Sequence, residues 1–286
     1  MTEKPIEYYQ ERGHYNPIEA ERLGVPLRVS KSSFMGYLWC PRQWWWNNIE
    51  LADIRTPPTD AMLRGTDVHD ALDSMYDKWD GDVELRPLFP SSTAETAYDV
   101  MVELENQRMD SWGVDSFAPV EHEVLHQVYY EPLNIMMVGK FDGVLRHPEG
   151  GLCLLELKTG GLASRKLSKT RQELCFYELM CRLMDWEPVT HFAFMAPDCD
   201  NADLVQGLMG QKRNKKELFL GDERGISIIE KVAGRSLKAF EKSLTKVIDG
   251  IRSHDWSMSW NDYTCPQYCE FHMACEQELG GLMTWD

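Results

Sequence analysis

The sequence lacks a long apolar segment, an excess of positive charge and any internal repeat. No run of about 18 apolar residues occurs, so we expect no membrane-spanning helix. The N-terminal segment MTEKPIEYYQERGHYNP has no apolar core of the signal-peptide kind, so we expect a cytoplasmic protein. The 30 lysines and arginines are outnumbered by 46 aspartates and glutamates, which gives a net charge of −16. This charge argues against a protein that coats nucleic acid, although it leaves room for a local basic groove.

The chain has 286 residues, enough for one large domain or two small ones at about 150 residues each. Its composition, with 43% hydrophobic and 27% charged residues, excludes a disordered or fibrous protein. Eight cysteines in a reducing compartment favour metal ligation over disulfides.

The apolar periodicity changes along the chain from helical to strand-like and back. Ser30 or Ser32 is expected to cap the first helix, and Pro41 is expected to begin the next one as its first residue. We expect further helices over residues 62–79, 91–112, 169–184 and 226–251. We expect strands over residues 120–130, 135–145, 152–158 and 189–195, and loops over residues 198–224.

These segments predict a small mixed β-sheet flanked by helices, with a helical layer made by both ends of the chain. The predicted divisions are an N-terminal arm (1–29), a helical segment (30–60), a core (61–252) and a C-terminal segment (253–286).

The segment His-Pro-Glu-Gly at 147–150 predicts a tight hairpin. Pro and Gly stand at the positions preferred in a type I turn followed by a left-handed residue. The resulting register places Asp142 directly opposite Glu156, with Lys158 on the same face. Two opposed carboxylates repel each other, and a divalent cation bound by oxygens relieves that repulsion. A solvated hairpin face with a frayed register is the alternative.

Several motifs resemble the PD-(D/E)XK nuclease superfamily in its RecB-like branch. GKFDGVL (139–145) and LLELKTG (154–160) resemble its core, and RGTDVHDAL (64–72) resembles its Gly-x-x-x-His helix. RQELCFYELM (171–180) resembles its Gln…Tyr helix. SKSSFMGYLWCPRQWWW (30–46) and CPQYCEFHMAC (265–275) resemble its split cysteine cluster. The combination is closest to the CRISPR-associated RecB-like iron–sulfur exonucleases and to the nuclease domain of AddB-type recombination proteins.

The resemblance implies a restriction-endonuclease-like α/β core that binds Mg²⁺ or Mn²⁺. It implies a set of metal ligands made of His69, Asp142, Glu156 and the backbone carbonyl of Leu157. Lys158 would orient the attacking water and stabilise negative charge on the phosphate, so Asp142, Glu156 and Lys158 are the expected catalytic residues. An early acidic residue of the family matches Glu121 or Glu123, and the sequence does not choose between them.

The helix after the hairpin carries the expected DNA contacts. The resemblance assigns Gln172 and Tyr177 to DNA or to the positioning of Lys158, although their spacing is five residues where four is expected. Lys166, Lys169 and Arg171 form a basic run at this helix, and residues 212–216 carry a second one. A buried Tyr177 and solvated loop cations are the alternatives.

Three cysteines of the C-terminal segment, Cys265, Cys269 and Cys275, lie close together in the sequence. The resemblance adds Cys40 as a fourth ligand, and four thiolates hold a 4Fe–4S cluster or a zinc ion. His272 is a rival fourth ligand and would favour zinc. We expect the site to be structural, and we expect the tryptophans of residues 39–46 to belong to the core more than to a base-stacking surface.

The sequence therefore predicts a metal-dependent exonuclease that acts on single-stranded DNA ends, with 5′ to 3′ polarity by resemblance, and an integrase or recombination complex as partner. The alternatives are a DNA-end-binding adaptor and a structure-specific endonuclease.

Overall fold

The chain forms two compact units in a computed structural model, which describes residues 4–52, 57–78, 92–159, 164–199, 216–222 and 224–283. Unit 1 contains residues 1–56, 127–138 and 241–286, and unit 2 contains residues 57–126 and 139–240. Both ends of the chain therefore contribute to unit 1, whereas the middle of the chain forms unit 2. None of the described helices has the length and apolar composition that a membrane crossing requires.

Helices and short helical turns make up most of the described parts of unit 1. They are α1 (Ile6–Arg12), α2 (Pro17–Leu23), α3 (Lys31–Trp39), α4 (Pro41–Trp45), the π-helical η1 (Trp46–Glu50), η3 (Glu131–Leu133), α10 (Thr264–Tyr268) and α11 (His272–Met283). Unit 2 contains α5 (Asp60–Lys78), α6 (Ser92–Trp112), η2 (Val114–Ser116) and α7 (Ser164–Leu183). Helix α9 (Gly234–Arg252) begins in unit 2 and continues in unit 1.

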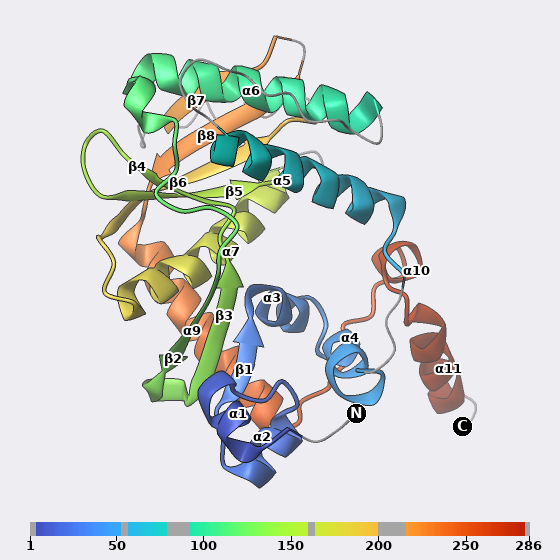
Figure 1. The fold of residues 1–286 in the computed structure, drawn as a ribbon. Coiled ribbons are helices and arrows are strands. Elements are labelled where there is room, and N and C mark those ends of the chain that lie inside the picture. The colour runs from blue at the N-terminus through green and yellow to red at the C-terminus, as the bar shows by residue number, and fades with distance from the viewer. Residues whose placement is uncertain are drawn as a thin grey trace. The chain divides into compact units, whose positions relative to one another are not determined.

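Within the described residues the strands form two sheets, as Figure 1 shows. The three-stranded sheet has the order β1-β3-β2, with β1 (Leu27–Ser30), β2 (Leu125–Tyr130) and β3 (Ile135–Lys140). The five-stranded sheet has the order β4-β5-β6-β8-β7, with β4 (Gly143–Arg146), β5 (Leu152–Leu157), β6 (Val189–Ala196), β7 (Lys216–Leu220) and β8 (Ile226–Lys231). Strands β5 and β6 are parallel, and the other pairs of this sheet are antiparallel. The predicted mixed sheet flanked by helices is therefore confirmed.

Residues 135–145 do not form the single strand that the sequence predicted. They split at Phe141 and Asp142 into β3 and β4, and these two strands belong to different sheets. The break arises because the segment leaves one ladder and enters another, and apolar periodicity does not reveal such a change of partner.

Two further expectations are wrong in their element type. Residues 226–231 form strand β8 rather than the start of the long helix, because this apolar segment pairs with β6 and β7 on its two sides. Residues 216–220 form strand β7 rather than a loop. The short apolar run of β8 fits a buried strand as well as a helix, and only the neighbouring strands decide between the two.

The core of unit 2 lies between the five-stranded sheet and helices α5 and α6. Val68 and Leu72 of α5 and Met101 of α6 are buried against Cys153 and Leu155 of β5. Figure 1 shows α5 and α6 on one face of this sheet and α7 on the other. The predicted inward face of β5 is confirmed, so Glu156 faces away from this core.

In unit 1, aromatic residues link the N-terminal helices to the C-terminal segment. Ser30 caps α3 by accepting a 3.0 Å hydrogen bond from the Ser33 amide, as predicted. Trp44 is 2% exposed and stacks on Trp256 with the ring centroids 5.5 Å apart. The Tyr37 hydroxyl donates a 2.7 Å hydrogen bond to the Asp255 carbonyl. Residues 1–29, the expected arm, contain α1, α2 and most of β1.

Two stacked imidazoles anchor the tight hairpin to strand β6. The rings of His147 and His191 are 3.5 Å apart at their centroids, and both residues are buried. Burial, and then the neighbouring His147 and Lys231, lower the pKa of His191 to about 4, although Glu149 and Glu217 act in the opposite direction.

We expect this pair to make stability depend on pH. Because the folded-state pKa of His191 lies below its unfolded value, its neutral form stabilises the fold fully above about pH 6.5, and this contribution is lost as the pH falls toward 4. His191→Phe should flatten the loss of unfolding free energy between pH 7 and pH 4.5, measured by urea denaturation. An unchanged pH dependence in this variant would contradict the assignment.

Candidate active site

The hairpin register places the two predicted carboxylate residues opposite each other. Strands β4 and β5 pair from Arg146 with Leu152 to Gly143 with Leu155, so the next pair along this ladder is Asp142 and Glu156. Asp142 Oδ2 accepts a 2.7 Å hydrogen bond from the backbone amide of Leu157. The predicted register is confirmed. The backbone of Leu157 contacts Asp142, and a role for its carbonyl in metal binding stays a prediction.

Lys158 lies between two buried glutamates. Its ammonium group donates 2.6 Å hydrogen bonds to Glu156 Oε1 and to Glu173 Oε2. The side chains of Glu156 and Glu173 are 2% and 9% exposed. The two bonds fix the ammonium group on the face of β5 that α7 covers.

Glu173 was missed by the sequence reasoning, which selected its neighbour Gln172. Glu173 stands four residues before Tyr177, the spacing that the family resemblance calls for, with a carboxylate in place of a carboxamide. That spacing was the signal that could have found it. Gln172 itself is half-buried, and its role in DNA binding stays a prediction.

Tyr177 is not on the surface, which corrects its expected contact with DNA. Its side chain is 2% exposed, and its hydroxyl donates a 2.6 Å hydrogen bond to the carbonyl of Lys140. Its ring packs so closely on Gly139 that a Cβ atom there would lie 2.5 Å from a ring carbon. Tyr177 therefore fixes the end of strand β3, two residues before Asp142.

A second group of ligands adjoins Asp142. His69 Nδ1 lies 3.1 Å from Glu123 Oε1 and 3.9 Å from Asp142 Oδ1. Each of the three residues offers an atom within 4.8 Å of the others, a spacing that suits one metal ion. Gly65, one turn before His69, lets α5 approach Thr159, whose hydroxyl would lie 3.2 Å from an added Cβ.

The structure chooses Glu123 over Glu121 as the early acidic residue. Glu121 contacts His126 instead, whereas Glu123 contacts both His69 and Lys140. The backbone of Glu123 has a φ of +53°, which is rare for a residue with a side chain and marks a position constrained by its surroundings. Its amide donates a 2.7 Å hydrogen bond to the Phe141 carbonyl, which holds it beside Asp142.

The electrostatics of this group are those of a cation site. Burial is the largest single effect and opposes the charged forms of His69 and Glu123. Their mutual hydrogen bond together with the neighbouring charges outweighs it, so the pKa of His69 is raised and that of Glu123 is lowered. The site holds four carboxylates and two ammonium groups, which leave an excess of two negative charges when the His69 ring is neutral. They belong to Glu123, Asp142, Glu156, Glu173, Lys140 and Lys158. Oxygen ligands with one imidazole suit Mg²⁺ and Mn²⁺.

Only part of the expected basic run presents an uncompensated positive charge in the described residues. Arg171 forms an ion pair with Glu230 of β8, which compensates its charge, and Lys169 is exposed. Lys166 lies in α7, but its side chain is outside the described residues. In the second run Lys216 pairs with Glu230 at 3.2 Å, and residues 212, 213 and 215 also lie outside the described residues.

A second group of possible ligands, His147, Glu149 and His191, lies at the opposite end of strand β5. Its two imidazoles are stacked with only 12° between their planes. The nitrogen lone pairs lie in the ring planes and therefore run side by side instead of converging on one ion. We therefore assign His147, Glu149 and His191 a structural role and not a metal-binding one.

Cys40, Cys265, Cys269 and Cys275 all belong to unit 1. Burial raises the pKa of Cys269, and the thiols of Cys265 and Cys40 raise it further. Burial, followed by Cys269 and Cys40, raises the pKa of Cys275 to about 11. His272 Nδ1 instead lies 2.9 Å from the Cys269 carbonyl. The thiol of Cys40 thus acts on both Cys269 and Cys275, and its role as the fourth ligand stays a prediction.

Three other cysteines belong to the core, whereas Trp44 is the one tryptophan of the described residues whose side chain is fully buried. Cys153, Cys175 and Cys181 are at most 1% exposed, as predicted. Trp46 stacks on Phe271, whereas Trp39 is 48% exposed.

Comparison with known proteins agrees with this geometry. The family model of the PD-(D/E)XK nuclease superfamily matches residues 28–276. The chain belongs to this superfamily. PD-(D/E)XK nucleases use divalent metals and act on nucleic acids, so the family suggests a metal-dependent nuclease, and the acidic groups are candidate metal sites.

Two further comparisons add little to this assignment. No curated protein matches the chain. The chain is also similar to a solved structure, the crystal structure of SSO0001, with 13% identity, 95% of each chain covered and a TM-score of 0.39.

We expect Glu173→Ala to lower the kcat of this nuclease about tenfold while leaving the KM for DNA nearly unchanged, because one charge-assisted hydrogen bond to Lys158 is lost. Glu173→Gln should restore part of the loss, since the carboxamide oxygen still accepts a hydrogen bond. Steady-state digestion of labelled DNA measures both constants.

Glu178 supplies the matched control, because it is a second buried glutamate of α7 and pairs with Arg182. Glu178→Ala should cost comparable stability without the fall in kcat. Equal losses of kcat in both alanine variants would assign Glu173 a purely structural role.

Proposed function

We propose that this PD-(D/E)XK protein is a metal-dependent exonuclease that hydrolyses single-stranded DNA from its ends. The observation that carries the nuclease chemistry is the apposition of Asp142 and Glu156, with Lys158 bonded to Glu156 on the same face. A DNA-end-binding adaptor has no need for an intact set of acidic ligands and lysine. The choice of single strands, and of 5′ to 3′ polarity, follows the resemblance to RecB-like exonucleases.

The site residues have separate tasks in this proposal. His69, Glu123, Asp142 and Glu156 would hold Mg²⁺ or Mn²⁺, which activates water and neutralises charge on the phosphate when bound. Lys158 orients the attacking water and stabilises the negative charge that develops on the phosphate oxygens. Glu173 holds the ammonium group of Lys158 in place, so that the position of this group does not depend on Glu156 alone.

A nucleic acid substrate needs positive contacts on a chain with a net charge of −16. Gln172, Lys166, Lys169 and Arg171 of α7 remain the proposed DNA contacts beside the site, with the charge of Arg171 compensated by Glu230. An integrase or recombination complex is the proposed partner, by resemblance to the CRISPR-associated and AddB-type proteins.

Asp142→Asn should abolish Mn²⁺-dependent digestion of linear single-stranded DNA, because a carboxamide neither balances the charge of the dication nor replaces the carboxylate ligand. A 5′ label should be released at once from linear strands, and circular single strands should stay intact. Gel analysis of both substrates, with the melting temperature of the variant as a control for folding, makes the measurement.

Each other outcome names a different function. Cutting of circular strands would identify an endonuclease, and end binding without cutting by the wild-type protein would identify an adaptor. Undiminished digestion by Asp142→Asn would refute the site itself.

We further propose that Cys40, Cys265, Cys269 and Cys275 hold a structural 4Fe–4S cluster. The mutual effects of their thiols on the pKa values of Cys269 and Cys275 support a common site. Thiolates are the usual ligands of such clusters. By joining α4 to the C-terminal helices, the site would stabilise the two chain ends within unit 1, and binding would be coupled to folding.

Protein purified without oxygen should be brown and contain about four iron atoms per chain. Cys40→Ala should lose both the colour and the iron and should melt at a lower temperature. Cys175→Ala, which removes a buried cysteine of unit 2, is the matched control and should keep the iron. Zinc without iron in the wild-type protein would contradict the cluster.

A further inference from the structure

Lys140 occupies a fixed position beside the metal-binding group, yet none of the sequence motifs assigns it a task. It is the last residue of strand β3, and its carbonyl accepts the buried hydrogen bond from Tyr177. The preceding Gly139 is held against the same ring. The backbone that carries this lysine is therefore immobilised by the core of unit 2.

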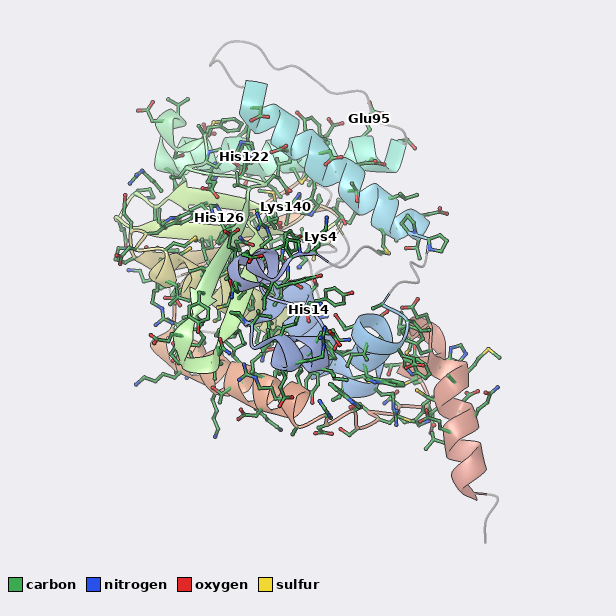
Figure 2. All side chains as sticks on the ribbon, turned by 60° about the horizontal axis from the view of Figure 1, so that its bottom comes forward. Lys4, His14, Glu95, His122, His126 and Lys140 are labelled. Carbon is green, nitrogen blue, oxygen red and sulfur yellow. The ribbon has the colours of Figure 1, made fainter. Side chains whose placement is uncertain are left out.

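The side chain of Lys140 reaches the candidate metal ligands from the solvent side. Its ammonium group contacts Glu123, and the hydrogen bond to Glu123 raises its pKa most. Burial opposes this shift, and the charges of Glu123, Asp142 and Asp70 add to it. The side chain is 53% exposed, compared with 29% for Lys158. Figure 2 labels Lys140 on the strands of unit 2, below helix α5.

A dication at this group would change the partner of Lys140. Glu123 presents Oε1 to His69 and Oε2 to Lys140, so a metal ion at Glu123 competes with the ammonium group for the same carboxylate. Two positive charges then repel each other at close range, and the half-exposed ammonium group needs another anion. The anion that a nuclease site supplies is a phosphate of its substrate.

We propose that Lys140 is a substrate-binding residue that contacts a phosphate of the nucleic acid strand once a dication has replaced it on Glu123. This inference rests on the proposed nuclease function. It differs from the role of Lys158, which is held by two glutamates. A merely structural lysine, which keeps Glu123 in place at all times, would favour metal binding, whereas a lysine that exchanges partners opposes it.

The test uses Lys140→Met, which keeps an unbranched side chain of nearly the same length and removes its charge. Calorimetric titration of the DNA-free protein with Mn²⁺ should show tighter binding in this variant, because the competing cation is gone. Binding of single-stranded DNA is measured in a Lys158→Met background, in which cutting is blocked and every proposed metal ligand is kept. With Mn²⁺ present, Lys140→Met should weaken DNA binding about fivefold at 0.1 M salt and lower the salt slope by about 0.7, as for one lost phosphate contact.

In EDTA the same substitution should leave the salt slope unchanged, because Glu123 then holds the ammonium group. Lys231→Met is the matched control, since Lys231 is 63% exposed and pairs with Glu149 away from this site. It should change neither Mn²⁺ binding nor the Mn²⁺-dependent part of the slope.

Weaker or unchanged Mn²⁺ binding by Lys140→Met would overturn the proposal. The proposal would also fail if the substitution had the same effect on the salt slope of DNA binding with Mn²⁺ as without it. Lys140→Arg, which keeps the charge, should retain the slope, and its loss there would also count against a phosphate contact. Digestion by the otherwise wild-type protein is assayed in parallel. Failure of that assay refutes the nuclease proposal, whereas failure of the Lys140 tests with normal digestion refutes this inference alone.

Discussion

The register of one short hairpin, which sets Asp142 opposite Glu156, is the constraint on which the candidate site depends. Two carboxylates directly opposed on a ladder lie about 5 Å apart at Cβ, and two unit charges at that distance repel by roughly 3 kcal/mol at an effective dielectric constant near 20. The turn fixes the register of Asp142 and Glu156, so the chain cannot relieve this repulsion by sliding. It brings positive charge to the site instead.

Two lysines supply that charge, each in a different way. Lys158 is shared by Glu156 and Glu173 in a mostly buried position, whereas Lys140 contacts Glu123 from the solvent side. The paired lysines make the acidic group tolerable in the fold, and the remaining excess of negative charge favours a dication. The lysines therefore offset part of the repulsion in the fold, and the negative charge that they leave uncompensated favours the binding of a dication.

The cysteines solve a separate problem at the ends of the chain. Residues 1–56 and 241–286 are far apart in the sequence but belong to one unit, joined by contacts such as the stack of Trp44 on Trp256. A cluster held by Cys40 and three C-terminal cysteines would add a covalent link to these noncovalent contacts. Its proposed role is thus to hold together the unit that both chain ends build, while the chemistry stays in unit 2.

Local sequence chemistry determined the hairpin and the inward face of β5, because a turn with Pro and Gly at set positions fixes register and register fixes faces. It also fixed the serine cap of α3, which depends on neighbours within one helical turn. Tertiary structure alone decided which strands pair, and so revealed β7, β8 and the break at Asp142. It also decided between Glu121 and Glu123, and it selected Glu173 and Lys140. These choices depend on contacts between side chains that are tens of residues apart in the sequence. Neither periodicity nor composition indicates which such side chains meet.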